Sequence, residues 1–518
     1  MKEKLKYYLP ILISMSMVLG IYIGYNIHKK LPYNSDFFDI THTNKWENLQ
    51  SLIEKNYVDK ITLDSLVEEN INNILRQLDP FSTYISSREL NSYNEDLNGE
   101  FFGIGVEYNL IEDTMNILGV KEEGPASEAG LEIGDKIISV NDSMIAGVKI
   151  TNEKVQSYFK GKKGKDLKVK LLRSSKLMTY QLKTNTVPLK SIVSQYMITP
   201  EIAYIKFDKF SAHSHAEISQ ALENLNKQGM KKLVLDLRNN SGGFLNQSVE
   251  IADEFLGGDK LITYTEGAQQ ERKEYKCRRH GLFEEGDMVV LVNKNSASAS
   301  EVLSGALQDW DRATIVGNET FGKGLVQEQF SLKDGSAIRL TVARYYTPLG
   351  RSIQKPYSKI GENISLDTLV KRDTFITPKG KLLYGGGGIY PDYFMKQELD
   401  SEVDTAFLKQ IVAYGKKSIF TFVFQFYVKH KNLFDSFHTK SKITYTKEIR
   451  KMFLSEIENY YFKNNKKDFY KTIQQQTERF LFILLTRYAY DIEAYYRYLN
   501  TDDTYVSKAL SLLSSTKK

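Results

Sequence analysis

The sequence has a single cysteine, Cys277, among 518 residues. One thiol cannot form an internal disulfide framework, and it excludes a metal site built from cysteine ligands. The net charge of +6 is spread along the chain without a dense basic block in its middle, which does not indicate a nucleic-acid-binding protein. The length predicts roughly two to four domains.

Histidine is also scarce, and none lies near Ser298, which follows the hydrophobic run 288–292. The nearest histidines to Ser298 and Lys323 along the chain are His280 and His430. After Ser298, apolar residues recur every three or four positions, as in a helix. The pattern predicts a strand, a turn carrying Ser298 and then a helix, whose free N–H groups would stabilise an oxyanion beside the hydroxyl.

Without a histidine, Ser298 needs another base, and Lys323 is the candidate. A free lysine has a pKa of about 10.4, whereas a general base works best near 7–8, so the shift needed is about 3 units or ~4 kcal/mol. Burial in an apolar pocket disfavours the charged form. Two glycines flank Lys323, and Phe321 and Leu325 beyond them are apolar. This setting predicts a desolvated, neutral lysine.

The N-terminus carries the one long apolar run of the chain. Residues 7–27 contain no charge and are about long enough to span a bilayer, which favours an uncleaved signal anchor at residues 1–30. A cleaved signal peptide has a shorter apolar core and a small-residue cleavage site, which the polar end of this run does not provide. Lysines on both sides of the run leave its orientation open.

The remainder divides by pattern into four segments. Residues 31–98 are expected to be helical, with a helix ending at Leu78 because Pro80 follows and the residue before a proline avoids helix. The apolar stripe of this segment is either a packing face or a homodimer contact. Residues 99–184 are expected to be β-rich, residues 185–398 mixed α/β, and residues 399–518 helical. The C-terminal segment carries no chemical motif. Its role is therefore expected to be packing or dimerisation, and the alternative is that its basic, aromatic surface binds an acidic partner or a membrane.

The β-rich segment contains a specific pattern at residues 124–141, which predicts a short helix, a glycine turn and a strand. This pattern resembles a PDZ domain. The resemblance implies that Gly103, Ile104 and Gly105 form the loop that holds a C-terminal carboxylate, because successive N–H groups create an anion-binding nest. The alternative is that these glycines only make a turn.

The α/β segment contains a buried-strand run, 233–238, followed by a polar, glycine-containing loop at 239–243. Glycine frees the backbone N–H to face a ligand, which makes Gly242 a candidate oxyanion donor. The alternative is a tight turn without a catalytic role. Taken together, the segments predict an α+β or mixed α/β multidomain fold: an α/β core with an inserted β-rich domain and helical segments at both ends.

Several separate motifs resemble those of the carboxyl-terminal processing peptidases, also called tail-specific proteases. They occur in the family order at residues 78–84, 124–141, 236–243, 296–301, 306–309, 321–327 and 345–351. The resemblance covers residues 45–395. It departs from the family at Ser241, where members often have proline, and at the C-terminal extension, which the minimal members lack.

The resemblance implies a serine endopeptidase with Ser298 as nucleophile, Lys323 as general base and Gln327 orienting the lysine amine. The N–H groups of Ala299 and Gly242 would form the oxyanion hole, with Gly243 the alternative donor. The expected substrates are proteins or peptides with apolar C-terminal tails, cut without a metal or cofactor. The resemblance also implies a bacterial inner-membrane location, with the catalytic part periplasmic or extracytoplasmic.

Asp309 matches an aspartate once proposed as a third catalytic member. It is not expected to contact Ser298, because eleven residues of helix separate them by about 16 Å.

Three other interpretations stay open. Residues 317–323 fit a phosphate-binding loop, but Gly324 replaces its Ser or Thr and the next residues alternate like a strand. His213 and His215 have a spacing that suits a metal, although they precede what is predicted to be a polar helix start. A PDZ scaffold with an inactive peptidase site is the third, and retention of Ser298, Lys323 and Gln327 argues against it.

Overall fold

The computed structural model describes residues 14–20, 22, 45–61, 63–161, 163–357, 373–396, 418–434, 445–462 and 475–515. The chain forms two compact units, Met1–Asn73 and Ile74–Lys518. Most of the predicted anchor, residues 1–30, lies outside the described residues. Among the residues that are described, no helix is both long and apolar enough to cross a membrane.

The first unit contains α2 (Lys45–Asn56) and the first turns of α3 (Leu63–Leu78). Leu49 and Leu52 of the predicted apolar stripe are exposed on α2. A homodimer contact through this stripe stays a prediction.

The helix α3 ends at Leu78, as the following proline predicts. Helix does not fill the rest of the segment predicted as helical, residues 31–98, because the strand β1 (Thr83–Ile85) lies between α3 and α4 (Ser87–Asn98). The Asp79 carboxylate accepts hydrogen bonds from the N–H groups of Phe81 and Ser82 at 2.8 and 2.7 Å, which closes a turn. This turn directs the chain into a sheet.

A β-rich module follows, with its strands in the order β3-β4-β5-β7-β8 and β6 paired to β5. Strand β3 lies at one edge of this sheet. Strands β2 and β9 pair antiparallel where the chain enters and leaves the module. The elements are β2 (Glu100–Gly103), β3 (Val106–Ile111), β4 (Thr114–Val120), α5 (Pro125–Glu128), β5 (Lys136–Val140), β6 (Ser143–Met144), α6 (Asn152–Phe159), β7 (Asp166–Arg173), β8 (Lys176–Lys183) and β9 (Asn185–Pro188).

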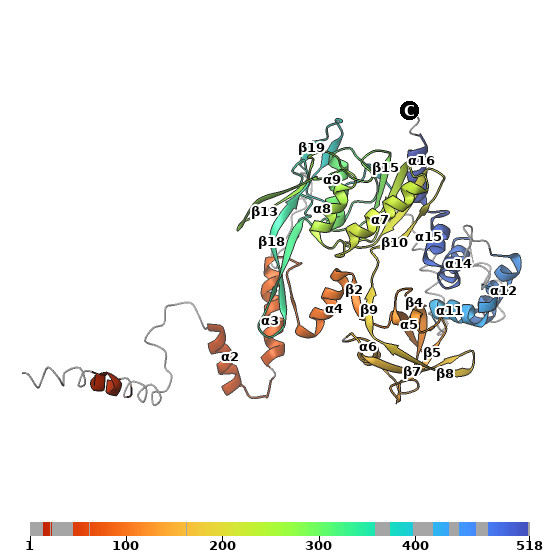
Figure 1. Ribbon diagram of the computed structural model, residues 1–518. Helices are drawn as coiled ribbons and strands as arrows, with labels where there is room; N and C mark the ends of the chain where they lie inside the picture. Colours follow the sequence, from red (N-terminus) through yellow and green to blue (C-terminus); the bar gives the residue numbers. More distant parts are fainter. Residues whose placement is uncertain are drawn as a thin grey trace, which may run out of the picture. The chain divides into compact units, whose positions relative to one another are not determined.

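The core sheet has the order β10-β11-β12-β15-β16-β21, parallel except for β10. Helices α7, α8 and α9 lie together beside the core sheet (Figure 1). Alternate residues of the strands pack against them on one face. Its strands and helices are β10 (Ile192–Met197), β11 (Ile202–Phe207), α7 (Ser214–Lys227), β12 (Lys232–Asp236), α8 (Leu245–Asp253), β15 (Met288–Val292), α9 (Ala299–Asp309), β16 (Thr314–Gly317) and β21 (Tyr393–Phe394). Since parallel strands end at the same edge, the loops after β12 and β15 are neighbours.

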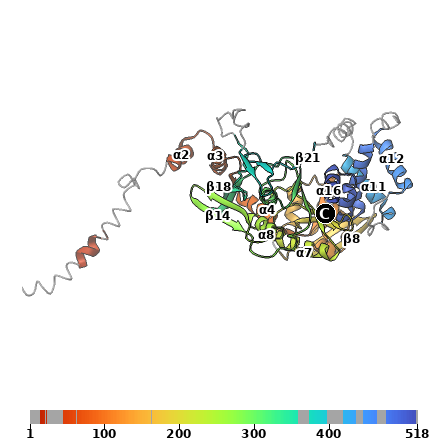
Figure 2. The ribbon, with the colours of Figure 1, turned by 90° about the horizontal axis from the view of Figure 1, so that it is seen from above.

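Helix α16, together with part of α15, covers the other face of the core sheet. Val234 of β12 and Val289 of β15 pack with Val506 and Ala509 of α16, which lies next to β15 in Figure 1. The other helices form a second hydrophobic cluster and are grouped with α16 in Figure 2. The elements are α11 (Ile419–Lys429), η2 (Lys431–Leu433), α12 (Lys447–Tyr461), α14 (Gln475–Ala489), α15 (Ile492–Asn500) and α16 (Thr504–Ser515). The end of the predicted helical segment is therefore packed on the core sheet, while its other described helices have a cluster of their own.

A second sheet carries the segment after Lys323. Strand β18 pairs with β17 along one edge and with β1 and β13 along the other. The strand predicted from alternation at 325–330 is confirmed by β17. The elements are β13 (Leu261–Gly267), β14 (Gln270–Lys276), β17 (Leu325–Ser331), β18 (Ala337–Tyr346) and the separate pair β19 (Thr374–Ile376) and β20 (Leu382–Tyr384).

Candidate active site

Ser298 lies where the sequence predicts it, between strand β15 and helix α9. Its backbone has φ 56° and ψ −115°, outside the usual regions for a residue with a Cβ. The Ala299 N–H at the start of α9 makes no hydrogen bond to any described residue. The strained turn therefore presents the half-buried hydroxyl beside a free backbone donor at a helix N-terminus.

The loop after β12 supports the Ser298 turn. The Asn240 carbonyl accepts hydrogen bonds from the Ala297 N–H at 3.0 Å and the Ser300 hydroxyl at 2.9 Å. The Ser296 hydroxyl donates to the Leu237 carbonyl at 2.8 Å. The position of Ser298 therefore depends on both loops.

A buried carboxylate, Glu301, joins the backbones on either side of the site. It accepts hydrogen bonds from the N–H groups of Ser298, Gly322 and Lys323 at 2.8, 2.8 and 2.9 Å, and from the Thr320 hydroxyl. Burial raises the pKa of Glu301 to about 7, although these hydrogen bonds oppose the shift. One side chain thus fixes the serine turn against the segment that carries the lysine.

The Lys323 amine is held by Gln327, as predicted. The Lys323 Nζ donates to the Gln327 Oε1 at 2.7 Å, and the Gln327 Nε2 donates to the Phe81 carbonyl at 2.7 Å. The Lys323 Nζ also lies 5.1 Å from the centre of the Phe81 ring. No hydrogen bond joins the Lys323 amine to the Ser298 hydroxyl in the described structure, although both line one cavity.

The surroundings of Lys323 shift its amine towards the neutral form. Burial lowers the pKa of Lys323, and the positive charge of Arg339 lowers it further, while the carboxylates of Asp79 and Glu301 oppose the shift. A neutral amine is the form that can accept a proton.

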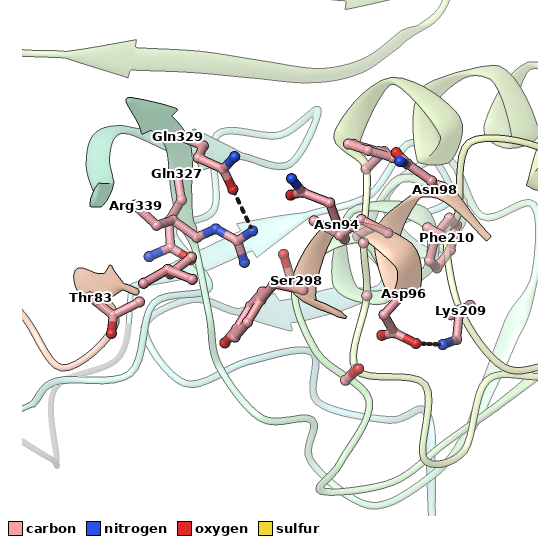
Figure 3. A pocket seen from close by; sticks show the side chains of 18 of the residues that line it. Thr83, Asn94, Asp96, Asn98, Lys209, Phe210, Ser298, Gln327, Gln329 and Arg339 are labelled. Atoms are coloured by element: carbon pink, nitrogen blue, oxygen red, sulfur yellow. Dashed lines mark hydrogen bonds and ion pairs between the residues drawn. The ribbon is translucent and has the colours of Figure 1, made fainter. Parts of the chain in front are cut away.

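The cavity that contains Ser298 and Lys323 has a volume of about 1480 Å³. Arg339 and Gln327 lie on one side of Ser298, and Asn94 and Asp96 of α4 lie on the other (Figure 3). Glu153 and Gln156 of α6 also line it, so the β-rich module borders the cavity. No histidine is among the described lining residues.

Gly242 lies directly against the serine. A Cβ added to Gly242 would be 2.8 Å from the Ser298 Cβ and 3.0 Å from the Ala299 nitrogen, and its φ is +98°. Its N–H donates to the Asn240 Oδ1 at 2.9 Å, whereas the neighbouring Gly243 N–H makes no hydrogen bond to a described residue. The predicted donor is therefore adjacent to Ser298 but engaged within its own loop in this structure.

Comparison with known proteins identifies the family. The model "Peptidase family S41" matches residues 201–366, and a PDZ domain model matches residues 103–184. A probable CtpA-like serine protease of Staphylococcus epidermidis (strain ATCC 12228) is 30% identical over 363 residues, which cover 69% of this chain and 72% of that protein. This chain belongs to peptidase family S41. It is a serine-type peptidase with a PDZ domain.

Two further likenesses extend this comparison. A probable CtpA-like serine protease of Staphylococcus aureus (strain COL) is 32% identical to this S41 peptidase over 346 residues, which cover 66% of this chain and 68% of that protein. Among solved structures, the photosystem II D1 C-terminal processing protease is 26% identical, with a TM-score of 0.37, and the match covers 69% of this chain and 88% of that chain.

In the PDZ domain of this S41 peptidase, the predicted carboxylate loop lies between β2 and β3. The carbonyls of Ile104 and Gly105 accept hydrogen bonds from the N–H groups of Ala126 and Lys121, both at 2.8 Å. The N–H groups of Ile104 and Gly105 make no hydrogen bond to a described residue. Gly103 belongs to β2 and pairs with Asn185, so it is a strand residue rather than a loop donor.

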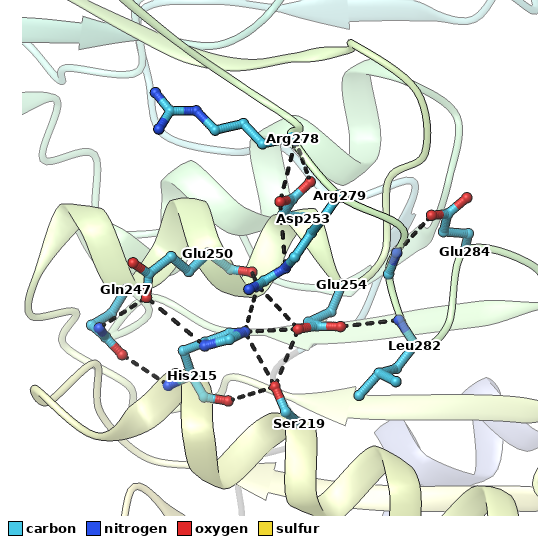
Figure 4. A network of polar contacts seen from close by, with 11 residues as sticks. His215, Ser219, Gln247, Glu250, Asp253, Glu254, Arg278, Arg279, Leu282 and Glu284 are labelled. Atoms are coloured by element: carbon cyan, nitrogen blue, oxygen red, sulfur yellow. Dashed lines mark hydrogen bonds and ion pairs between the residues drawn. The ribbon is translucent and has the colours of Figure 1, made fainter.

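The histidine pair of the metal hypothesis lies elsewhere in the S41 peptidase. His213 precedes α7, and His215 lies in its first turn, where a polar helix start is predicted. Figure 4 shows that His215 contacts Glu254, with 2.7 Å between its Nε2 and the Glu254 Oε1, and Arg279 meets the same carboxylate. The described residues include no group of His, Cys, Asp and Glu that could hold a metal ion.

Asp309 forms a buried ion pair at the far end of α9. Its Oδ1 lies 2.6 Å from the Arg351 Nη2, and both side chains are fully buried. This contact gives Asp309 a structural partner away from Ser298, in agreement with the distance expected from the sequence.

Sequence reasoning missed three contributors to the S41 site. Glu301 could have been found, since a glutamate three residues after a serine at a helix start is a capping-box pattern. The role of the Phe81 carbonyl and the charge of Arg339 carried no local signal. Each acts on a residue distant in sequence, and only the fold brings them to the cavity.

Proposed function

We propose that this S41 peptidase is a Ser298–Lys323 endopeptidase that cleaves proteins near their C-termini. The observation that carries the proposal is the lysine amine held by Gln327 within the serine's cavity, where burial lowers the pKa of Lys323 and no described histidine is present. The substrates would be proteins or peptides with apolar C-terminal tails.

The proposed reaction begins with proton transfer from the Ser298 hydroxyl to the neutral Lys323 amine. The Ser298 Oγ attacks the scissile carbonyl, and the oxyanion is stabilised by the Ala299 N–H together with an N–H of Gly242 or Gly243. Lys323 then protonates the leaving amine, and the acyl-enzyme forms. Water, deprotonated by the same lysine, hydrolyses it.

The resting structure must rearrange for this reaction. The Lys323 amine must approach the Ser298 hydroxyl while keeping its contact with Gln327. If Gly242 is the donor, its N–H must exchange the Asn240 Oδ1 for the oxyanion. Gly243 would require no such exchange, since its N–H has no described acceptor.

In this proposal, the PDZ domain selects the substrate by binding its C-terminus. A C-terminal carboxylate would bind the N–H groups of Ile104 and Gly105, and the tail would add to the edge strand β3. From there the chain would pass α6, whose residues Glu153 and Gln156 line the cavity of Ser298.

Amidating the C-terminus of a peptide substrate is expected to raise KM by about 10- to 100-fold, because charged hydrogen bonds contribute about 1.5–3 kcal/mol. The measurement is kcat and KM for paired peptides with free and amidated ends. The matched control replaces an internal aspartate of the tail by asparagine, which removes the same charge elsewhere. Equal KM values for the free and amidated peptides would count against carboxylate docking.

The pH dependence of kcat/KM should reflect the protonation of Lys323. As pH falls through the lowered pKa of Lys323, the amine becomes charged and kcat/KM is lost. Replacing Arg339 by glutamine removes a positive charge that lowers this pKa. The pKa of Lys323 should therefore rise, and the acid limb of the profile should move to higher pH.

The control is Arg344→Gln, which removes an exposed arginine of the same strand outside the cavity lining. Its acid limb should match that of the wild-type enzyme. An unmoved limb in Arg339→Gln would contradict the lysine assignment and leave Glu301, whose pKa burial raises to about 7, as the group that titrates.

We also propose that residues 1–30 anchor the enzyme to a bacterial inner membrane, with the catalytic part periplasmic or extracytoplasmic. The uncharged run 7–27 supports this location. The full-length chain should stay with membranes after alkaline carbonate washing, and release into the supernatant would refute the anchor.

A further inference from the structure

The C-terminal helices reach the loop that supports the serine. The Arg238 Nη1 donates to the Asp503 Oδ2 at 2.8 Å, and the two side chains are only 16% and 15% exposed. The other oxygen of the Asp503 carboxylate accepts the N–H groups of Tyr505 and Val506 at 2.8 and 2.9 Å. Asp503 therefore caps α16 with one oxygen and holds Arg238 with the other.

Arg238 is also contacted by the buried Asp236 and the half-buried Tyr505. Its Nη2 lies 2.6 Å from the Oδ2 of the buried Asp236, at the end of strand β12. Its guanidinium carbon lies 5.0 Å from the centre of the Tyr505 ring. The guanidinium is therefore held between the core sheet and the C-terminal helices.

The loop that begins at Arg238 positions the catalytic groups. The Asn239 Oδ1 accepts hydrogen bonds from the Asn293 and Asn295 side chains, both at 2.9 Å, which ties it to the turn before Ser298. Asn240 binds both this turn and the Gly242 N–H. A shift of Arg238 would thus move the glycines and the serine turn together.

The same helices also contact the PDZ domain. The Arg487 Nη2 lies 3.2 Å from the Oε2 of Glu107 on the edge strand β3, and the Lys431 Nζ lies 2.5 Å from the Glu132 Oε2. These pairs are more exposed than the Arg238–Asp503 pair, and exposed ion pairs contribute little. The buried contact is the one expected to affect the reaction.

We propose that Asp503 is a positioning residue for the oxyanion loop, so that the C-terminal extension completes the active site. Through Arg238 its carboxylate fixes residues 239–243, and with them the Gly242 and Gly243 N–H groups. The inference rests on the proposed function, in which one of these groups binds the oxyanion.

The test is Asp503→Asn in the full-length enzyme. Asparagine caps helices about as well as aspartate, so α16 should stay capped while the charge facing Arg238 is lost. We expect kcat per active site to fall about 10- to 100-fold, less than the loss of a complete oxyanion donor, with KM changed less than about twofold. Active sites are counted with a fluorophosphonate probe.

A peptide boronate, whose tetrahedral adduct mimics the oxyanion, should lose affinity by the same factor as kcat. The cleaved peptide product should bind unchanged. A purely structural role would instead reduce the number of active sites. It would leave both kcat per active site and the boronate affinity of the remaining sites at their wild-type values.

Asp502→Asn is the matched control, because Asp502 is the neighbouring aspartate and its side chain is exposed. Its Oδ2 lies 3.2 Å from the Arg479 Nη1 at the surface. The kcat of this variant should equal that of the wild-type enzyme. Asp503→Glu retains the charge and should recover most of the rate.

Wild-type kcat in Asp503→Asn, or a loss explained by fewer active sites, would overturn the inference. If Ser298→Ala abolishes cleavage while Asp503→Asn is fully active, only this inference fails. If Ser298→Ala still cleaves, the proposed function fails first.

Discussion

Replacing Ser298 by alanine, or Lys323 by methionine, is expected to lower kcat by about 10⁴- to 10⁶-fold. Alanine removes the attacking oxygen, and methionine keeps the length of the side chain but cannot accept a proton. The two losses should be similar and the double variant no worse, because the residues act as a unit. The measurement is cleavage of an unfolded protein with an apolar C-terminus, followed by mass spectrometry.

The controls are Ser331→Ala and Lys333→Met, which make the same changes at exposed positions around the β17–β18 turn. Both should cleave at the wild-type rate. Equal cleavage by Ser298→Ala and the wild-type enzyme would remove the serine assignment. An absence of cleavage by every protein, the wild type included, would favour the inactive PDZ scaffold.

Gly242→Ala is expected to lower kcat by about 10²- to 10³-fold, the usual effect of losing an oxyanion donor. The added methyl would lie 2.7 Å from the Ala297 carbonyl oxygen and 2.8 Å from the Ser298 Cβ. Both groups belong to the rigid serine turn, so the loop and the turn must separate. Steady-state kinetics and thermal unfolding of the same preparations provide the measurement.

Gly258→Ala serves as the control for backbone strain. Gly258 also has a positive φ, +78°, but no atom of a described residue beyond its chain neighbours lies within 4 Å of an added Cβ. It should lose stability to a similar degree while keeping its kcat. If Gly242→Ala turns over as fast as Gly258→Ala, the glycine loop does not contribute to the oxyanion hole.

The sequence predicted the structure correctly where an element depends on residues that are close together along the chain. The apolar run before Ser298, the helical spacing after it and the alternation after Lys323 each predict an element that the structure contains. Backbone periodicity and short spacings carry this information directly. The Lys323–Gln327 contact was expected from the resemblance to the carboxyl-terminal processing peptidases.

The sequence was uninformative where the site depends on contacts between distant segments. Phe81 accepts from Gln327 across 246 positions, and Arg238 meets Asp503 across 265. The strand β1 was not foreseen for the same reason, because it forms only by pairing with the distant β18. The C-terminal helices carry no chemical motif, and the packing of α16 on the core sheet could not be predicted from local pattern.

Trapping the acyl-enzyme tests the central claim most directly. The full-length enzyme is mixed with a peptide ester at a pH where the lysine is neutral, quenched in acid within milliseconds and analysed by intact mass and peptide mapping. The proposed mechanism predicts an acyl mass on Ser298, formed rapidly in the wild-type enzyme, at a strongly reduced rate in Lys323→Met and never in Ser298→Ala. Turnover with no adduct on Ser298, or rapid acylation without Lys323, would contradict it.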